Sequence, residues 1–113
     1  MVDSDARGQL RQLTLAVGRL AASADEQRQA LAGAVVADEL ALDYASAYDL
    51  LPTLSGQGVS LGDVAEGLAR HLDGLLSVPP GAEFWSEAAL VDDPAWEEVR
   101  TTARALQTYL PVE

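Results

Sequence analysis

Apolar residues return every three or four positions along most of this 113-residue chain, which is the spacing of an α-helix with one buried face. Strict alternation of apolar and polar residues, the pattern of a half-buried strand, is absent. With 49% hydrophobic residues, a chain of this length can bury one sizeable core. We therefore expect an all-α fold with a single compact helical domain over residues 1–113.

Four main helical segments are predicted, over residues 4–22, 25–51, 61–76 and 94–110. Ser23 and Glu26 have the spacing of a capping box before the second segment, and Asp93-Pro94 is a typical helix start. Pro52 is expected to end the second segment and to open a loop over residues 52–59, after which Ser60 caps the third. The economical assembly is a four-helix, bundle-like domain, with a short extra helical turn or loop over residues 83–90.

The first and last segments each carry one narrow apolar stripe. We expect both stripes to lie in the core, with Leu15 left exposed on the first segment and Trp96 packed at the head of the last. The predicted core residues of these segments are Ala6, Leu10, Leu13, Val17 and Leu20, and Trp96, Val99, Ala103, Leu106 and Leu110.

The second segment differs because it is apolar on two opposite faces. One face holds Leu31, Ala34, Val35, Leu42 and Ala45, together with the carboxylates of Asp38 and Asp49. The other holds Val36, Leu40, Tyr44, Ala47 and Leu51. A helix with two apolar faces is either central in its domain or shared with a partner chain, so a homodimer formed through this helix is one alternative.

Composition excludes several classes of function. The formal net charge is −11 and all seven basic residues are arginines, so we expect no nucleic-acid partner and no membrane partner. Without cysteine there is no disulfide and no thiolate metal site, and we expect no metal, no cofactor and no catalytic residue. The absence of Lys, Ile and Asn is typical of a high-G+C bacterial genome. The acidic N-terminus lacks the features of a signal peptide, so we expect a cytoplasmic protein.

Acidic residues crowd the middle of the second segment, which suggests a contact face for a basic partner protein. An aromatic group formed by Phe84, Trp85 and Trp96 either covers one end of the bundle or offers Trp85 as an exposed anchor. The favoured function is therefore non-catalytic protein–protein interaction, as an inhibitor, an immunity-like protein or an accessory subunit. The candidate interaction residues are Asp38, Glu39, Asp43, Tyr44, Tyr48 and Trp85.

His71, the single histidine, lies within the third segment in the run GLARHLDGLL. An acidic four-helix bundle with one mid-helix histidine resembles a histidine phosphotransfer domain, and the resemblance implies that His71 accepts a phosphoryl group. In that family, Lys follows the histidine at three positions and Gly at four. Here Asp73 and Gly74 follow instead, so the lysine is missing and the glycine comes one residue early.

A small helical enzyme or ligand-binding protein is the remaining alternative. Arg100 and Arg104, one helical turn apart, could bind a carboxylate or phosphate ligand, although pairing with the chain's own 18 acidic residues is the simpler interpretation. No nucleophile elbow, phosphate loop, dinucleotide fingerprint or zinc pattern is present, and nothing in the sequence points to catalysis.

Overall fold

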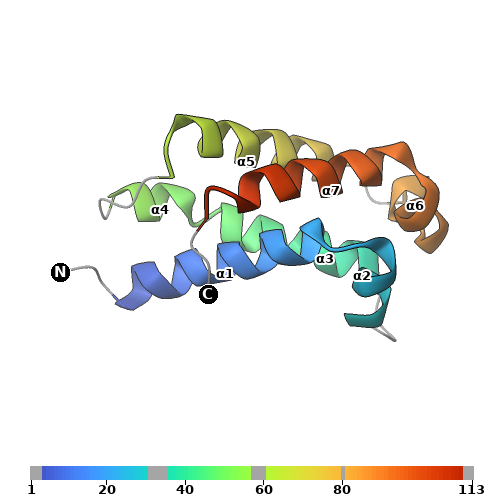
Figure 1. The fold of residues 1–113 in the computed structure, drawn as a ribbon, viewed down its shortest axis with the longest axis horizontal. Helices are drawn as coiled ribbons and strands as arrows, with labels where there is room; N and C mark the ends of the chain where they lie inside the picture. Colours follow the sequence, from blue (N-terminus) through green and yellow to red (C-terminus); the bar gives the residue numbers. More distant parts are fainter. Residues whose placement is uncertain (1–3, 31–35, 57–60, 80, 111–113) are drawn as a thin grey trace.

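The structure is a computed structural model that describes residues 4–30, 36–56, 61–79 and 81–110 (Figure 1). Every regular element in these residues is helical, which confirms the predicted all-α fold. The elements are α1 (Ser4–Ala21), α2 (Ala24–Ala30), α3 (Val36–Tyr48), α4 (Leu51–Gly56), α5 (Asp63–Leu76), the 3-10 turn η1 (Glu83–Trp85), α6 (Glu87–Asp92) and α7 (Pro94–Gln107).

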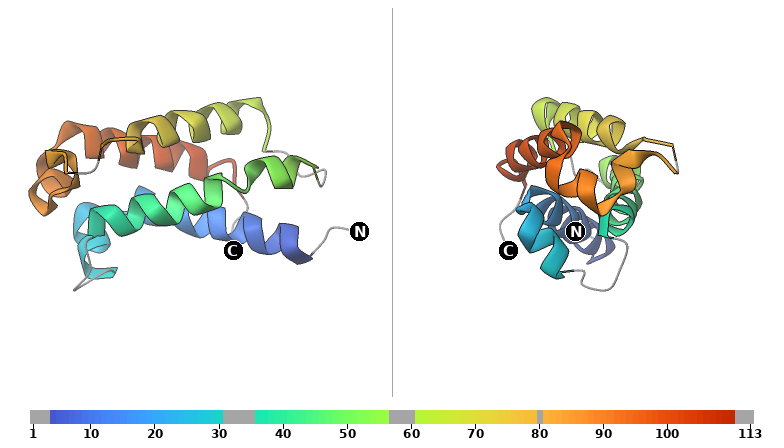
Figure 2. Two further views of the ribbon diagram at one scale, coloured as in Figure 1. Left: turned by 180° about the vertical axis from the view of Figure 1, so that it is seen from behind. Right: turned by 90° about the vertical axis from the view of Figure 1, so that its right-hand side faces the viewer.

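The long helices α1, α3, α5 and α7 form a bundle in which successive members run in opposite directions (Figures 1 and 2). Helix α1 packs against α3 and α7, and α5 packs against the same two helices from the other side. The short elements α2, η1 and α6 gather at one end of the bundle, and α4 lies at the other end. The predicted bundle-like packing of four main helices is thereby confirmed.

The core lies between these four helices and extends to α6 and the aromatic group. Leu15 of α1 is exposed, as expected, and Leu10 is only partly buried. The whole predicted stripe of the last helix is buried. The fully buried side chains with the largest volumes are Trp96, Tyr44, Leu13, Leu20, Leu40, Leu72, Leu90 and Leu106.

The expectation of one long helix over residues 25–51 is wrong. Helices α2 and α3 point in different directions, and α3 ends at Tyr48, before the turn residues Asp49 and Leu50 (Figure 2). The cause is tertiary, because α2 is held across the end of α1, where the Gln27 side chain donates to two of its backbone carbonyls. Only α3 then runs back along the bundle, and it buries the face that contains Leu40 and Tyr44.

The predicted loop over residues 52–59 is also wrong over its first part. Pro52 lies in the first turn of α4 rather than after the end of a helix. Proline is tolerated there because the first N–H groups of a helix have no partner within it. Residues 57–60 lie outside the described residues, and with them the predicted cap Ser60, while Gly62 directly precedes α5.

Two predicted helix starts are confirmed by their hydrogen bonds. The Glu26 N–H donates to the Ser23 hydroxyl at 3.2 Å and the Ser23 N–H donates to the Glu26 carboxylate at 3.3 Å, which is a capping box. At the start of α7, the Asp93 carboxylate accepts the Ala95 N–H at 2.9 Å. The short helical turn expected before the last helix is present as η1 and α6.

Candidate functional site

The candidate site is a groove of about 410 Å³ between the first half of α3 and the end of α5, which we call the acidic groove. Two carboxylates, Asp38 from α3 and Asp73 from α5, lie on its two sides, and the described lining contains no basic residue. Apolar side chains make up most of the remainder. The lining residues in the described part of the chain are Asp38, Ala41, Leu42, Tyr44, Ala45, Asp73, Leu76, Ser77, Val78 and Trp85.

Leu42 is the most exposed of the large apolar side chains in the described residues, with 60% of its surface accessible. It lies one helical turn after Asp38, so a carboxylate and an aliphatic side chain are neighbours on this surface of α3. Leu42 belongs to the first of the two apolar faces predicted for this segment, the one that also holds Asp38. The earlier members of that face, Leu31, Ala34 and Val35, lie outside the described residues. A large exposed leucine beside a carboxylate can contact a partner that is both basic and apolar.

Trp85 belongs to the lining of the groove and is fixed by hydrogen bonds and ring contacts. Its indole N–H donates to the backbone carbonyls of Val78 at 3.2 Å and Pro79 at 3.0 Å. Its ring packs edge-on against Phe84 and Trp96, with centroid distances of 4.9 and 6.4 Å. Trp85 is half-buried. It therefore covers the end of the core, as one sequence interpretation proposed, while its remaining surface lines the groove.

Tyr44 is a buried residue of the groove lining. It is fully buried, and its hydroxyl donates a hydrogen bond of 2.8 Å to the Ala69 carbonyl of α5. Burial raises the pKa of this hydroxyl far above the ordinary tyrosine value, and the nearby Tyr48 and Asp73 raise it further. The hydroxyl therefore stays protonated as a structural donor. A buried Tyr44 joins α3 to α5 and does not itself present a surface to a partner.

The other candidate residues are not gathered in the acidic groove. Asp43 forms an ion pair of 2.9 Å with Arg19 of α1, on another side of α3. Glu39 is exposed and does not belong to the groove lining. Tyr48 stacks on Tyr44 with a centroid distance of 5.8 Å and lines a separate cavity near the end of α3.

His71 is exposed on α5, and its Nε2 atom lies 3.3 Å from the Glu98 carboxylate of α7. A carboxylate at this distance repels an incoming phosphoryl group, so this surrounding does not favour the phosphotransfer hypothesis. No group of three or more His, Asp or Glu side chains within the described residues is placed to hold a metal ion.

Arg100 and Arg104 serve the bundle itself. The guanidinium of Arg100 is buried and donates to the Leu90 carbonyl at 2.9 and 2.7 Å, and its Nε atom lies 3.3 Å from Glu97. Arg104 donates to the Ala21 carbonyl at the end of α1, at 2.9 Å. Among the described residues, the predicted pairing with acidic residues is present for Arg100 at Glu97, while the main acceptors of both arginines are backbone carbonyls of α6 and α1.

Sequence reasoning missed Asp73 as a member of the groove. It appeared only as a departure from the phosphotransfer pattern, although it lies one turn before the end of an amphipathic helix. Its proximity to Asp38 arises from the packing of α3 against α5, which no local pattern reveals. Leu42 could have been recognised from the sequence, because it lies on one of the two apolar faces predicted for the second segment.

None of the helices in the described part of the chain has the length and apolar character needed to cross a membrane. Comparisons of the chain with protein-family models, with curated proteins and with solved structures found no match.

Proposed function

We propose that this chain is a non-catalytic protein-binding module whose acidic groove receives a basic, partly apolar segment of a partner protein. An inhibitor, an immunity-like protein or an accessory subunit would act in this way. The observation that carries the proposal is the placement of Asp38 and Asp73 on the two sides of a mainly apolar groove that opens beside an exposed Leu42.

Charge complementarity selects the partner. Neither groove carboxylate has an ion-pair partner in the described part of the chain, and the whole chain carries −11. An arginine or lysine side chain entering the groove would meet both carboxylates, and its methylene groups would pack on Leu42 and Trp85. Arginine would also stack on the half-buried indole of Trp85, which gains further energy from a cation–π contact.

The first test uses a defined probe, a fluorescent peptide of alternating arginine and leucine residues. Two matched peptides accompany it, one with glutamine in place of arginine and one with serine in place of leucine. We expect the arginine–leucine peptide to bind best, by fluorescence anisotropy, and its affinity to fall as salt rises, because the Debye length shortens to about 10 Å at 0.1 M. Equal binding of all three peptides, or affinity that does not change with salt, contradicts the proposal.

Variants of the protein locate the binding surface. Asp38→Asn and Asp73→Asn should each weaken binding about fivefold to thirtyfold, the range expected when one charge contact of roughly 1–2 kcal/mol is lost. Glu39→Gln is the matched control, because it removes the same charge from the same helix outside the groove lining. If Glu39→Gln weakens binding as much as Asp38→Asn, the interaction depends on overall charge and the groove is not the site.

A second copy of the chain is the competing occupant of this surface. Leu42 on one chain could cover the same groove on another, as the predicted homodimer would require. Sedimentation velocity at micromolar concentration distinguishes the two cases. A dimer that Leu42→Ser dissociates would show that the groove serves self-association, and the proposal of a basic partner would then fail.

A further inference from the structure

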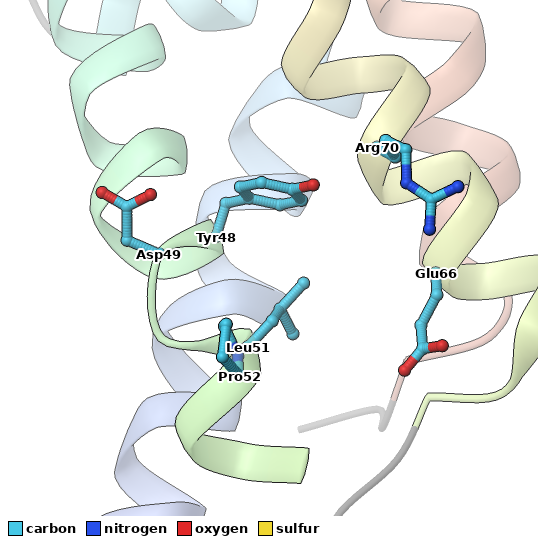
Figure 3. A pocket seen from close by; sticks show the side chains of 6 residues that line it. All are labelled: Tyr48, Asp49, Leu51, Pro52, Glu66 and Arg70. Carbon is cyan, nitrogen blue, oxygen red and sulfur yellow. The ribbon is translucent and has the colours of Figure 1, made fainter. Parts of the chain in front are cut away.

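A second cavity, of about 320 Å³, lies where the end of α3 and the start of α4 face α5. It is separate from the acidic groove, which the first half of α3 and the end of α5 enclose. Its volume is at the small end of the range for ligand pockets, about 300–1,000 Å³. The lining residues, shown in Figure 3, are Tyr48, Asp49, Leu51, Pro52, Glu66 and Arg70.

The guanidinium of Arg70 distinguishes this cavity. Arg70 has no hydrogen-bond or ion-pair partner among the described residues, although the chain holds 18 acidic residues. By contrast, Arg19, Arg28 and Arg100 pair with carboxylates, and Arg104 donates to a backbone carbonyl. An unpaired arginine that lines a cavity has its donors available for a ligand.

The geometry of the neighbours suits a carboxylate. Figure 3 shows the ring of Tyr48 reaching across from α3, with its hydroxyl directed toward α5, where Arg70 projects into the same space. A guanidinium binds a carboxylate through two parallel hydrogen bonds, and a phenol hydroxyl can donate a third.

Two carboxylates, Asp49 and Glu66, belong to the described lining of the cavity. Glu66 is the one that shares α5 with Arg70. It lies one helical turn before Arg70, and its carboxylate is turned away from the guanidinium, so the two charges do not neutralise each other (Figure 3). Side chains at this spacing have Cβ atoms about 5–6 Å apart. A ligand that carries an ammonium and a carboxylate on one carbon atom offers an opposite charge to Glu66 and to Arg70, whereas a plain anion would be repelled by Glu66 and Asp49. Leu51 and Pro52 form the apolar wall.

We propose that this cavity, which we call the Arg70 cavity, binds a free α-amino acid with an apolar side chain. Arg70 and Tyr48 hold its carboxylate, Glu66 holds its ammonium group, and its side chain packs against Leu51 and Pro52. This site does not depend on the protein-binding role proposed for the acidic groove.

The test titrates the full chain with three probes and follows backbone amide shifts by NMR. The probes are L-leucine, N-acetylleucine, which keeps only the carboxylate, and leucinamide, which keeps only the ammonium group. We expect leucine to bind with a Kd of about 1 mM or tighter, and each derivative to bind at least about tenfold more weakly, because each leaves one charged group without a partner. The shifted amides should belong to residues 48–52 and 66–70.

Variants identify the groups responsible. Arg70→Gln should weaken leucine binding at least about tenfold, and Glu66→Gln should remove the preference for leucine over N-acetylleucine. Arg28→Gln, on α2 at the other end of the bundle, is the matched control and should bind leucine normally. Thermal unfolding establishes that each variant is folded. Absent binding at about 20 mM leucine, shifts confined to other residues, or unchanged binding by Arg70→Gln would each overturn the proposal.

Discussion

The buried guanidinium of Arg100 should be one of the strongest single supports of this bundle. Only 3% of Arg100 is exposed, and two of its N–H groups donate to the backbone carbonyl of Leu90. In a continuing helix that carbonyl would accept the N–H of the residue four positions later. That residue is Pro94, which has no N–H, so Arg100 supplies the donor that the chain cannot.

The expected magnitude follows from the groups left without partners. Replacing Arg100 by methionine keeps an unbranched apolar stem but removes the guanidinium, so the Leu90 carbonyl loses both of its donors. It also removes a longer bond of 3.4 Å to the Gln27 side-chain carbonyl. An unsatisfied buried acceptor costs about 1–3 kcal/mol, so two of them should lower the free energy of unfolding by about 2–6 kcal/mol. That is a large part of the roughly 5–15 kcal/mol of a typical domain.

Urea unfolding followed by tryptophan fluorescence measures this loss. With a slope of about 1–3 kcal/mol per molar urea, the midpoint for Arg100→Met should fall by at least about 0.7 M. Arg100→Lys, which keeps the charge but not the planar fork, should fall between wild type and Arg100→Met. Arg28→Met is the control, because Arg28 lies on the surface, where its contact with Asp25 is 4.0 Å long, and its replacement should change stability by less than about 0.5 kcal/mol. A midpoint for Arg100→Met at or above that of the wild type would refute the reasoning, since the cost of burying the cation would then cancel its hydrogen bonds.

Two further predictions concern single hydrogen bonds. Asp93→Ala removes the side-chain cap of α7 and should lower the free energy of unfolding by about 0.5–2 kcal/mol in the same urea assay, whereas Asp92→Ala, one residue earlier in the sequence, should have little effect. Because the folded state raises the pKa of Tyr44, its contribution to stability is fully present below the ordinary tyrosine pKa of about 10 and is lost as pH rises above it. Tyrosinate absorbance should therefore show one residue that ionises only as the chain unfolds, and Tyr44→Phe should lack this late step; early ionisation of all tyrosines would contradict the burial argument.

Local patterns predicted the parts of the fold that depend on local physics. The apolar spacing of α7, its Asp93-Pro94 start and the capping box at Ser23 each involve residues within two turns of helix, and the structure contains all three. The prediction of one long second helix was wrong, and the placement of α2 involves a contact with a distant part of the chain. The Gln27 side chain donates to backbone carbonyls at the end of α1, and the residues around Gln27 do not predict that contact.

The candidate site shows the same division. The sequence singled out Asp38 and Trp85 as candidate interaction residues, and both line the acidic groove. The sequence did not indicate Asp73, because its place in the groove results from the packing of α3 against α5. The Arg70 cavity was missed for a related reason. A single arginine on an amphipathic helix predicts an exposed salt bridge, and only the structure shows that no carboxylate pairs with it in the described residues.

Several of the arginines that contribute to the net charge are used in contacts within the chain. Arg100 is withdrawn into the core, Arg104 donates to the end of α1, and Arg19 is paired with Asp43. These three cations hold helices together and offer little charge to a partner. The surface around the first half of α3 is consequently more acidic than the total of −11 suggests, because the described lining of its groove contains no compensating cation. Substituting Arg100 should therefore alter stability, whereas substituting Asp38 should alter binding, and these two effects can be measured independently.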